Sequence, residues 1–413
     1  MVKVCWRSRA TVFGVALVIG ASAFLAVLPN QANAATSPWQ LILKQARGER
    51  VNLWMWSGDP QGNLYVDRYL APAAAKLGVT LHRIAISDTK DALNRALSEK
   101  VAGSRKGTVD LVWVNGDNFK TGVQAGLWAC NWASHLPNAT YEDAKDPLLV
   151  SDFGTLVNGC EAPWHKAQFS LVYNAGTVKN PPKSMDELFQ WIKANPGRFT
   201  YPIVDDFTGA AFIRQALYAT SGGFRNVPQR FDAARYAQLT PRLWEILKGI
   251  KSALWRAGQT YPQSSVEMDK LYSDGQIDFT MTYGPATLTR LVADGTFPAR
   301  TRILNLSSGT LGNASFLALS KSSANQAGAQ VVANLALSPQ QQLIKSDPTK
   351  WGQFSVLDMK RLSKADQLLF AQIPTSAVVP PFSVLSKNAN PELGAAWIAP
   401  LARDWRKYIL QSQ

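Results

Sequence analysis

The stretch from Phe169 to Phe199 reads FSLVYNAGTVKNPPKSMDELFQWIKANPGRF. Its first five residues are apolar and rich in β-forming side chains, and the Asn-Ala-Gly sequence at 174–176 is a turn signal, so a short buried strand is predicted. Two prolines at 181–182 prevent a helix before Ser184, whose hydroxyl can cap the segment that follows. The stretch therefore predicts a strand, a turn and a capped helix, and by itself it implies no chemistry.

On both sides of this stretch, predicted strands alternate with helical patterns. Most of these strands end in a small polar turn, after which apolar residues recur with helical spacing. Such alternation is typical of α/β folds with largely parallel sheets, whose ligands bind beyond the carboxyl ends of the strands. The other predicted strands are residues 51–56, 79–86, 109–115, 199–204, 277–283 and 315–320.

Several predicted helices begin with a recognisable cap. A Ser followed three residues later by Glu has the spacing of a capping box, and Pro is favoured at the first helical position. Three predicted helix starts carry such signals: Ser184 with Glu187, Ser264 with Glu267, and Ser338 before Pro339.

The first 34 residues have the pattern of a secretory signal peptide. Basic residues precede an apolar run from Thr11 to Leu28, and an Ala-Asn-Ala sequence at 32–34 is a small-x-small cleavage pattern. We expect cleavage after Ala34 and a periplasmic mature chain of 379 residues, enough for two sizeable cores. An uncleaved anchor is the alternative, because the run is about long enough to span a bilayer.

The charge balance does not indicate a nucleic-acid partner. The formal net charge is +14, and it falls to +11 when the three basic residues and no acids of the signal are removed. Lys and Arg are scattered, without a run of five or more and without an arginine-rich tail. The composition fits a basic exported protein.

The cysteines agree with export. Cys5 lies in the signal, and Cys130 and Cys160 remain as a pair, which predicts a disulfide in an oxidising compartment. The bond would close a loop of 31 residues and stabilise the fold by about 3–4 kcal/mol in the loop-entropy model. Two free buried thiols are the alternative. No CxxC or HxxxH spacing accompanies them, so no metal site is expected.

Six segments, in order along most of the mature chain, resemble class II extracellular solute-binding proteins of ABC importers. Their sequences are most similar to the branch of this family whose neighbouring members carry thiamine, polyamines or ferric ion. The segments are LVYN (171–174), PPKSMDEL (181–188), TGAAF (208–212), LYSDGQIDFTMTYGP (271–285), NASFLALS (313–320) and ALSPQQQ (336–342).

The resemblance implies an α/β protein of two doubly wound lobes joined by hinge strands. Lobe one would comprise residues 35–166 with 315–347, and lobe two residues 167–314 with 348–413. Such a protein is a periplasmic monomer that uses no cofactor, closes on a small organic solute and delivers it to an inner-membrane ABC permease. Ferric ion is a poorer cargo, because its carriers offer adjacent tyrosines and this chain has no Tyr-Tyr pair.

Four strand-to-helix turns are the candidate ligand contacts. Helix starts present free backbone N–H groups that suit a carboxylate or phosphate, although Asp and Asn at such places are also ordinary caps. The candidate turn residues are Ser57, Gly58, Asp59, Asn115, Gly116, Asp117, Thr208, Gly209 and Tyr283.

Tryptophans beside two of these turns suggest a cage for an organic cation such as thiamine. Trp56 ends one predicted strand and Trp113 lies on another, near Asp59 and Asp117, so cation–π attraction and charge pairing could act together. Core packing is the alternative, because parallel strands are buried on both faces. The residues Trp164 and Tyr173 flank the first crossing between lobes and could stack on a solute or pack in the hinge.

An enzyme on the same fold is the competing class. The chain has three histidines, His82, His135 and His165, and no GxSxG, HExxH or GxxxxGK[ST] motif. No catalytic residues are therefore expected. A ligand-loaded partner of a sensor or chemoreceptor would share every feature of the transport protein, so the residues do not separate those two functions.

Overall fold

The computed structural model describes residues 1–2, 4, 37–104, 106–374 and 376–411. The chain divides into residues Met1–Ser37 and a compact unit, Pro38–Gln413, and every helix and strand that the structure describes belongs to the second unit. Apart from residues 1, 2 and 4, the expected signal peptide lies outside the described residues. Within the described ranges, no helix is both long and apolar enough to cross a membrane.

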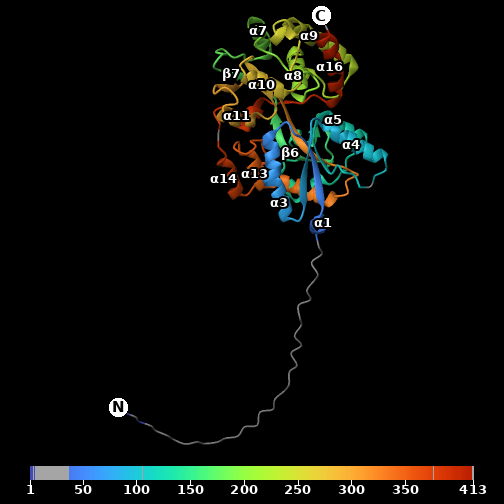
Figure 1. The fold of residues 1–413 in the computed structure, drawn as a ribbon, viewed down its shortest axis with the longest axis vertical. Coiled ribbons are helices and arrows are strands. Elements are labelled where there is room, and N and C mark those ends of the chain that lie inside the picture. Colours follow the sequence, from blue (N-terminus) through green and yellow to red (C-terminus); the bar gives the residue numbers. More distant parts are fainter. Residues whose placement is uncertain (3, 5–36, 105, 375, 412–413) are drawn as a thin grey trace. The chain divides into compact units, whose positions relative to one another are not determined.

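A six-stranded sheet, with its flanking helices, forms the first lobe (Figure 1). The strand order is β11-β10-β3-β1-β2, and β6 pairs with β10. The pairing is parallel between β1 and its neighbours β2 and β3, whereas β10 runs antiparallel to β3 and β6, so β1, β3 and β6 end at the same edge. The strands are β1 (Arg50–Trp56), β2 (Thr80–Ile86), β3 (Leu111–Val114), β6 (Glu161–Gln168), β10 (Leu311–Leu319) and β11 (Asn390–Pro391).

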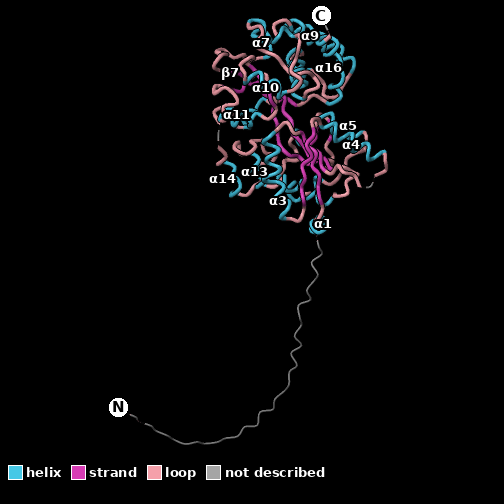
Figure 2. The backbone as a smooth tube through the Cα atoms, in the orientation of Figure 1, coloured by secondary structure: helices cyan, strands magenta, loops and turns pink. Residues whose placement is uncertain are grey.

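Helices cover both faces of this sheet, as Figure 2 shows for α3 and α13 on one side and α4 and α5 on the other. One hydrophobic cluster joins Leu53 of β1 to Val331 of α12, and another joins Val112 of β3 to Leu93 and Phe119. The helices are α1 (Pro38–Ala46), α2 (Pro60–Tyr65), the π-helical segment Val66–Leu70, α3 (Ala71–Lys76), α4 (Thr89–Val101), α5 (Gly116–Gln124), α12 (Gln326–Ala336), α13 (Pro339–Ser346) and α14 (Lys364–Ala371).

A second lobe is built on the antiparallel sheet β8-β7-β9. Its helices pack around one large cluster that includes Phe169, Phe212 and Trp405. The elements are β7 (Ser170–Asn174), α7 (Met185–Ala194), α8 (Phe207–Thr220), α9 (Ala233–Lys251), α10 (Ser265–Ser273), β8 (Phe279–Thr282), α11 (Leu288–Ala293), β9 (Thr301–Ile303), α15 (Phe382–Leu385) and α16 (Ile398–Trp405). Between β3 and β6 lie α6 (Pro147–Val150), β4 (Ser151–Asp152) and β5 (Thr155–Leu156).

Two of the crossings between the lobes are adjacent. The chain leaves the first sheet at Gln168 and begins β7 at Ser170, and it returns from β9 to β10 at Leu311. The backbone N–H of Phe169 donates to the carbonyl of Leu311 at 2.8 Å, so the two crossings are hydrogen-bonded to each other.

Residues beyond 347, where the resemblance placed a lobe boundary, pack in the core of the first lobe. Trp351, Val356 and Leu362 belong to the hydrophobic cluster of β1 and α12, so this segment is part of the first lobe's core. The physical reason is the stacking of Trp351 on Tyr65, with ring centroids 5.2 Å apart.

Most of the predicted elements are present, and the α/β class is confirmed. One prediction is wrong: residues 199–204 form no strand. Pro202 has no N–H to donate to a ladder, and Ile203 N–H bonds instead to the carbonyl of Pro262 at 3.0 Å. The Cys130–Cys160 disulfide is confirmed.

Candidate functional site

The turn after β8 meets the first lobe where the chain crosses between lobes. Gln168 N–H donates to the carbonyl of Tyr283 at 3.2 Å. A Cβ added to Gly284 would lie 2.9 Å from Nε2 of Gln353, so glycine lets the two lobes approach closely here. This junction lies at the edge where β1, β3 and β6 end, which is the edge where such sheets bind ligands.

The turn at Asp59 is a helix cap. Asp59 Oδ1 accepts from Gln61 N–H at 3.1 Å and Gly62 N–H at 3.0 Å, and Oδ2 accepts from Trp351 Nε1 at 2.6 Å. Burial raises the pKa of Asp59, against these hydrogen bonds, which lower it. Both carboxylate oxygens are therefore already hydrogen-bonded, and this residue is not a free countercharge for a cation.

The residues before Asp59 sit at the surface. Ser57 and Gly58 are exposed, and Ser57 hydrogen-bonds to the carbonyl of Ile86. The indole of Trp56 lies against Gly58, because a Cβ there would come within 2.1 Å of the ring. Trp56 is half-buried against its own turn.

The turn at Thr208 and Gly209 is also a structural cap. Both N–H groups donate to Oδ1 of Asp206, at 2.8 and 3.1 Å, and Oδ2 accepts from Ser265 N–H at 2.9 Å. A Cβ on Gly209 would lie 2.3 Å from two backbone carbonyl oxygens, which accounts for the glycine. Since Asp206 holds these N–H groups, they are not available to an anionic ligand.

In the turn at Asn115, the asparagine side chain makes no hydrogen bond to the residues that the structure describes. Asn115 precedes α5 but makes no side-chain cap bond, and it is half-buried, as is Asp117. Gly116, with φ +61°, donates its N–H to Oδ2 of Asp152 at 2.7 Å. Burial raises the pKa of Asp152 to about 8, and the nearby Glu392 raises it further, against the Gly116 hydrogen bond. The Asn115 amide therefore differs from Asp59 and Asp206, whose side chains cap their helices.

Of the predicted aromatic residues, two belong to cores. Trp164 is fully buried, with its ring centroid 5.3 Å from that of Trp113. Tyr173 packs in the second lobe against Phe279, with centroids 6.2 Å apart. Trp113 is half-buried and also meets the His165 ring, at 5.4 Å between centroids, so it remains a candidate wall of a site.

The hydroxyl of Tyr283 is held in a buried cluster that joins the second lobe to Glu392, which directly follows β11 of the first sheet. It donates to Oε1 of Glu392 and accepts from Nη2 of Arg214 at 3.2 Å, while Arg214 Nε donates to Oε2 of Glu392 at 2.9 Å. Burial lowers the pKa of Arg214, but Glu392 more than offsets this and leaves it above its ordinary value. The rings of Phe153 and Phe207 lie 5.3 and 5.9 Å from the guanidinium carbon. Tyr283 is therefore fixed by protein partners.

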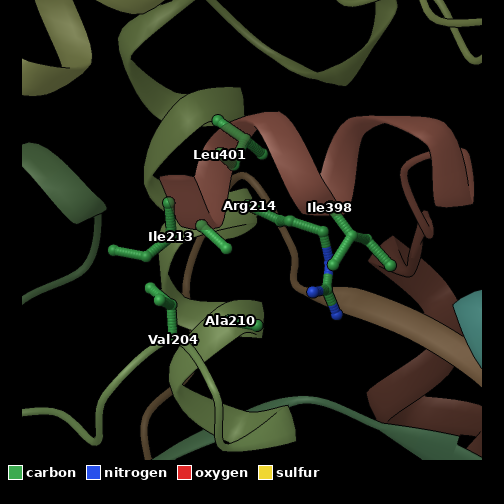
Figure 3. Close-up of a pocket in the computed structure, with 7 residues that line it drawn as sticks. Val204, Ala210, Ile213, Arg214, Ile398 and Leu401 are labelled. Carbon is green, nitrogen blue, oxygen red and sulfur yellow. The ribbon is translucent and has the colours of Figure 1, made fainter. Parts of the chain in front are cut away.

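Beside this cluster is a cavity of about 10 Å³, lined by Val204, Ile213, Arg214 and Leu401 among others. Figure 3 shows Arg214 extending toward Ile398 and away from Ile213. A space of this size holds at most one water molecule. It is a packing defect of the second lobe and not a solute site.

The sequence reasoning missed a group of four polar side chains, which we call the polar strip. Asn313 lies opposite Ala167 and Ser315 opposite His165 in the β10–β6 pair, and opposite residues share a face of the sheet. The antiparallel bridge between residues 166 and 354 places Gln353 beside Ala167, on the edge of β6 that faces away from β10. The polar strip is His165, Asn313, Ser315 and Gln353.

The polar strip is buried and only partly hydrogen-bonded. Its members are 3–5% exposed. In the part of the chain that the structure describes, nothing hydrogen-bonds to Nδ1 of His165, to either amide atom of Asn313, or to Oε1 of Gln353. Each unpartnered buried group costs about 1–3 kcal/mol, so a natural protein retains several together where a ligand or water binds. Polar residues at alternate positions in the NASFLALS segment were the available signal.

The fold is that of periplasmic binding proteins. A periplasmic thiamin-binding protein matches with a TM-score of 0.59 and 16% identity over 88% of this chain and 96% of that chain. A spermidine/putrescine substrate-binding protein from Streptococcus pneumoniae matches with a TM-score of 0.61 and 12% identity over 87% and 99%.

The sequence comparisons specify the family. The profile of bacterial extracellular solute-binding proteins matches residues 68–355, and the chain belongs to this family. It is also 35% identical over 371 residues to protein YnjB of Escherichia coli K12, a match that covers 89% of this chain and 93% of that protein. The family is one of transport proteins that bind solutes, and its fold was correctly inferred from the six quoted segments.

Proposed function

We propose that this protein captures a small organic solute between its two lobes and delivers it to an inner-membrane ABC permease. The polar strip carries the proposal, because it is buried and incompletely hydrogen-bonded, and because its member Gln353 lies against Gly284 of the other lobe. A binding protein that encloses its cargo gains affinity from such enclosure, with a few polar groups fixing orientation.

The two crossings supply the hinge of the proposed capture. Domain closure around a ligand needs a few residues at element ends that absorb the change in backbone angles. Residues 168–170 and 304–310 meet this need, because they lie between strands of different sheets. When the lobes separate, Gly284 leaves Gln353 and the strip opens to solvent.

The expected organic cation finds little support in the geometry around Asp59. The carboxylate has three protein donors, and the Trp113 ring is engaged with His165 and other aromatic residues. The thiamin and polyamine proteins of the same fold are too distant in sequence to transfer a ligand. The polar strip is therefore the better guide to the charge of the solute.

We also propose that the protein binds without turnover and reaches the periplasm by cleavage after Ala34. His165 has no carboxylate partner in the part of the chain described, and burial holds its pKa well below the ordinary value, which suits neutral hydrogen bonding better than proton transfer. The mass of protein isolated from the periplasm should correspond to residues 35–413; a mass retaining the first 34 residues would contradict cleavage.

Native mass spectrometry of gently purified periplasmic protein tests the capture. The expected spectrum contains a complex heavier than the mature chain by one small molecule, which is released unchanged when the protein unfolds. A ligand-free spectrum, followed by no thermal shift with any compound of a periplasmic extract, would contradict the proposed function. Release of a chemically altered compound after incubation would favour an enzyme.

A further inference from the structure

The polar strip combines donors and acceptors without a full charge. Asn313 offers an amide with both atoms unpartnered, and Gln353 offers a carbonyl oxygen. Burial, with a smaller effect of Lys345, lowers the pKa of His165, so the imidazole is neutral, with one nitrogen donating and the other accepting. Ser315 adds a hydroxyl on the same face.

Ala167 separates the two amides of the strip. Asn313 and Gln353 lie on either side of Ala167, whose methyl group is the smallest side chain in the row. Asn115 lies next to the polar strip, because Val114 pairs with Phe316 and Asn115 is therefore beside Ser315. A solute at this place would meet polar groups along one edge and the half-buried Trp113 beside them.

Several charged groups near the strip already have protein partners. Asp59 accepts from two N–H groups and from Trp351, and the guanidinium of Arg214 is paired with Glu392. Lys345, beneath His165, donates to the carbonyl of Trp164 and to Oε1 of Gln342. The side chain of Arg290, which is near Asp59, lies 2.6 Å from Asp294.

We infer that the solute is uncharged and carries several hydroxyl groups, as a sugar or polyol does, and that Asn313 is its central contact. This inference rests on the proposed function. A hydroxyl both donates and accepts, so neighbouring hydroxyls match an amide, an amide oxygen and a neutral imidazole in turn. A buried ion would need a free opposite charge, whereas Asp59, Arg214 and Lys345 already have protein partners.

Titration of ligand-stripped protein with compounds of defined charge tests the inference. The uncharged probes are D-glucose, D-xylose, myo-inositol and D-mannitol; the charged probes are thiamine, spermidine, choline and glucose 6-phosphate. The solute released from periplasmic protein is identified alongside them. An uncharged polyhydroxylated solute, with binding only among uncharged probes, supports the inference.

Other results separate the two proposals. A released solute that is charged at neutral pH, or a charged probe that binds at least tenfold more tightly than every uncharged one, overturns the inference and leaves the proposed function standing. No released solute and no bound probe overturn both.

Variants locate the binding. Asn313→Leu is nearly isosteric and should weaken binding of the released solute at least 100-fold, and Gln353→Leu at least tenfold. Asn94 is exposed on α4, and its side chain hydrogen-bonds to no residue in the described part of the chain, so Asn94→Leu is the matched control and should bind normally.

Stability distinguishes a lost contact from a damaged fold. Because Asn313 has no protein partner in the described residues, Asn313→Leu should melt at or above the temperature of the ligand-free wild type. Normal affinity in a well-folded Asn313→Leu protein would overturn the role of Asn313. If Asn313→Leu melts at a lower temperature, the affinity of Gln353→Leu for the solute becomes the test. Unchanged affinity of Gln353→Leu would overturn the role of the polar strip in binding.

Discussion

Individual residues divide the candidate site into structural and free groups. Asp59 and Asp206 bind the N–H groups of their own helices, whereas Asn115 and Asn313 have amides without a protein partner in the described chain. An aspartate after a strand was a reasonable candidate ligand, but the sequence does not say which donors its oxygens meet. The distinction depends on contacts such as Trp351 Nε1 to Asp59, which are 292 residues apart.

Replacing Asp59 should affect stability first. Asp59→Ala removes a cap, at a cost of about 1–2 kcal/mol, and leaves the buried indole N–H of Trp351 unpaired. Urea unfolding should therefore show a larger loss than Asp88→Ala, which removes the exposed cap of α4. Equal losses would mean that the Trp351 contact contributes nothing.

Asp152 should make stability depend on pH. Its pKa is raised to about 8 in the folded protein, above the ordinary value of an unfolded aspartate, so the folded state binds more protons between those pH values and stability falls as pH rises through them. Each unit of raised pKa corresponds to about 1.4 kcal/mol. Asp152→Asn should raise the melting temperature at pH 8 and change it less at pH 5. A gain independent of pH would contradict this reasoning.

At the scale of elements, local sequence signals predicted helix caps correctly, whereas they did not predict which distant segments pair. Ser184, Ser264 and Ser338 cap their helices as predicted. In both capping boxes, however, the glutamate bonds to the residue before the cap, as Glu187 does to Lys183 N–H. Residues 199–204 have strand composition, but Pro202 and the partner segment at Pro262 prevent a ladder. The polar strip exists only through the pairing of β6, β10 and residue 353.

The disulfide should contribute measurably to this fold. Cys130 and Cys160 are bonded, and closing a loop of 31 residues stabilises by about 3–4 kcal/mol in the loop-entropy model. A reductant should lower the urea midpoint of the wild type and leave the double variant Cys130→Ser/Cys160→Ser unchanged. A reductant effect of similar size on both proteins would contradict the prediction.

At the scale of the whole molecule, composition and the six quoted segments led to the correct class, because export signals and strand-helix order are readable along the chain. They did not indicate that residues 351–362 return to the first lobe's core, since that depends on Trp351 packing among aromatic residues far away in sequence. The sequence proposed the carboxyl ends of the strands as the ligand-binding edge, whereas the polar strip comes from segments that only the fold brings together.

The central claim is that one solute contacts both lobes. Hydrogen–deuterium exchange of ligand-stripped protein, with and without its released solute, tests it most directly. We predict slower exchange on binding in two places at once: β10 with residues 352–355 of the first lobe, and residues 279–285 of the second. Protection confined to one lobe, or no protection at saturating solute, would contradict the account.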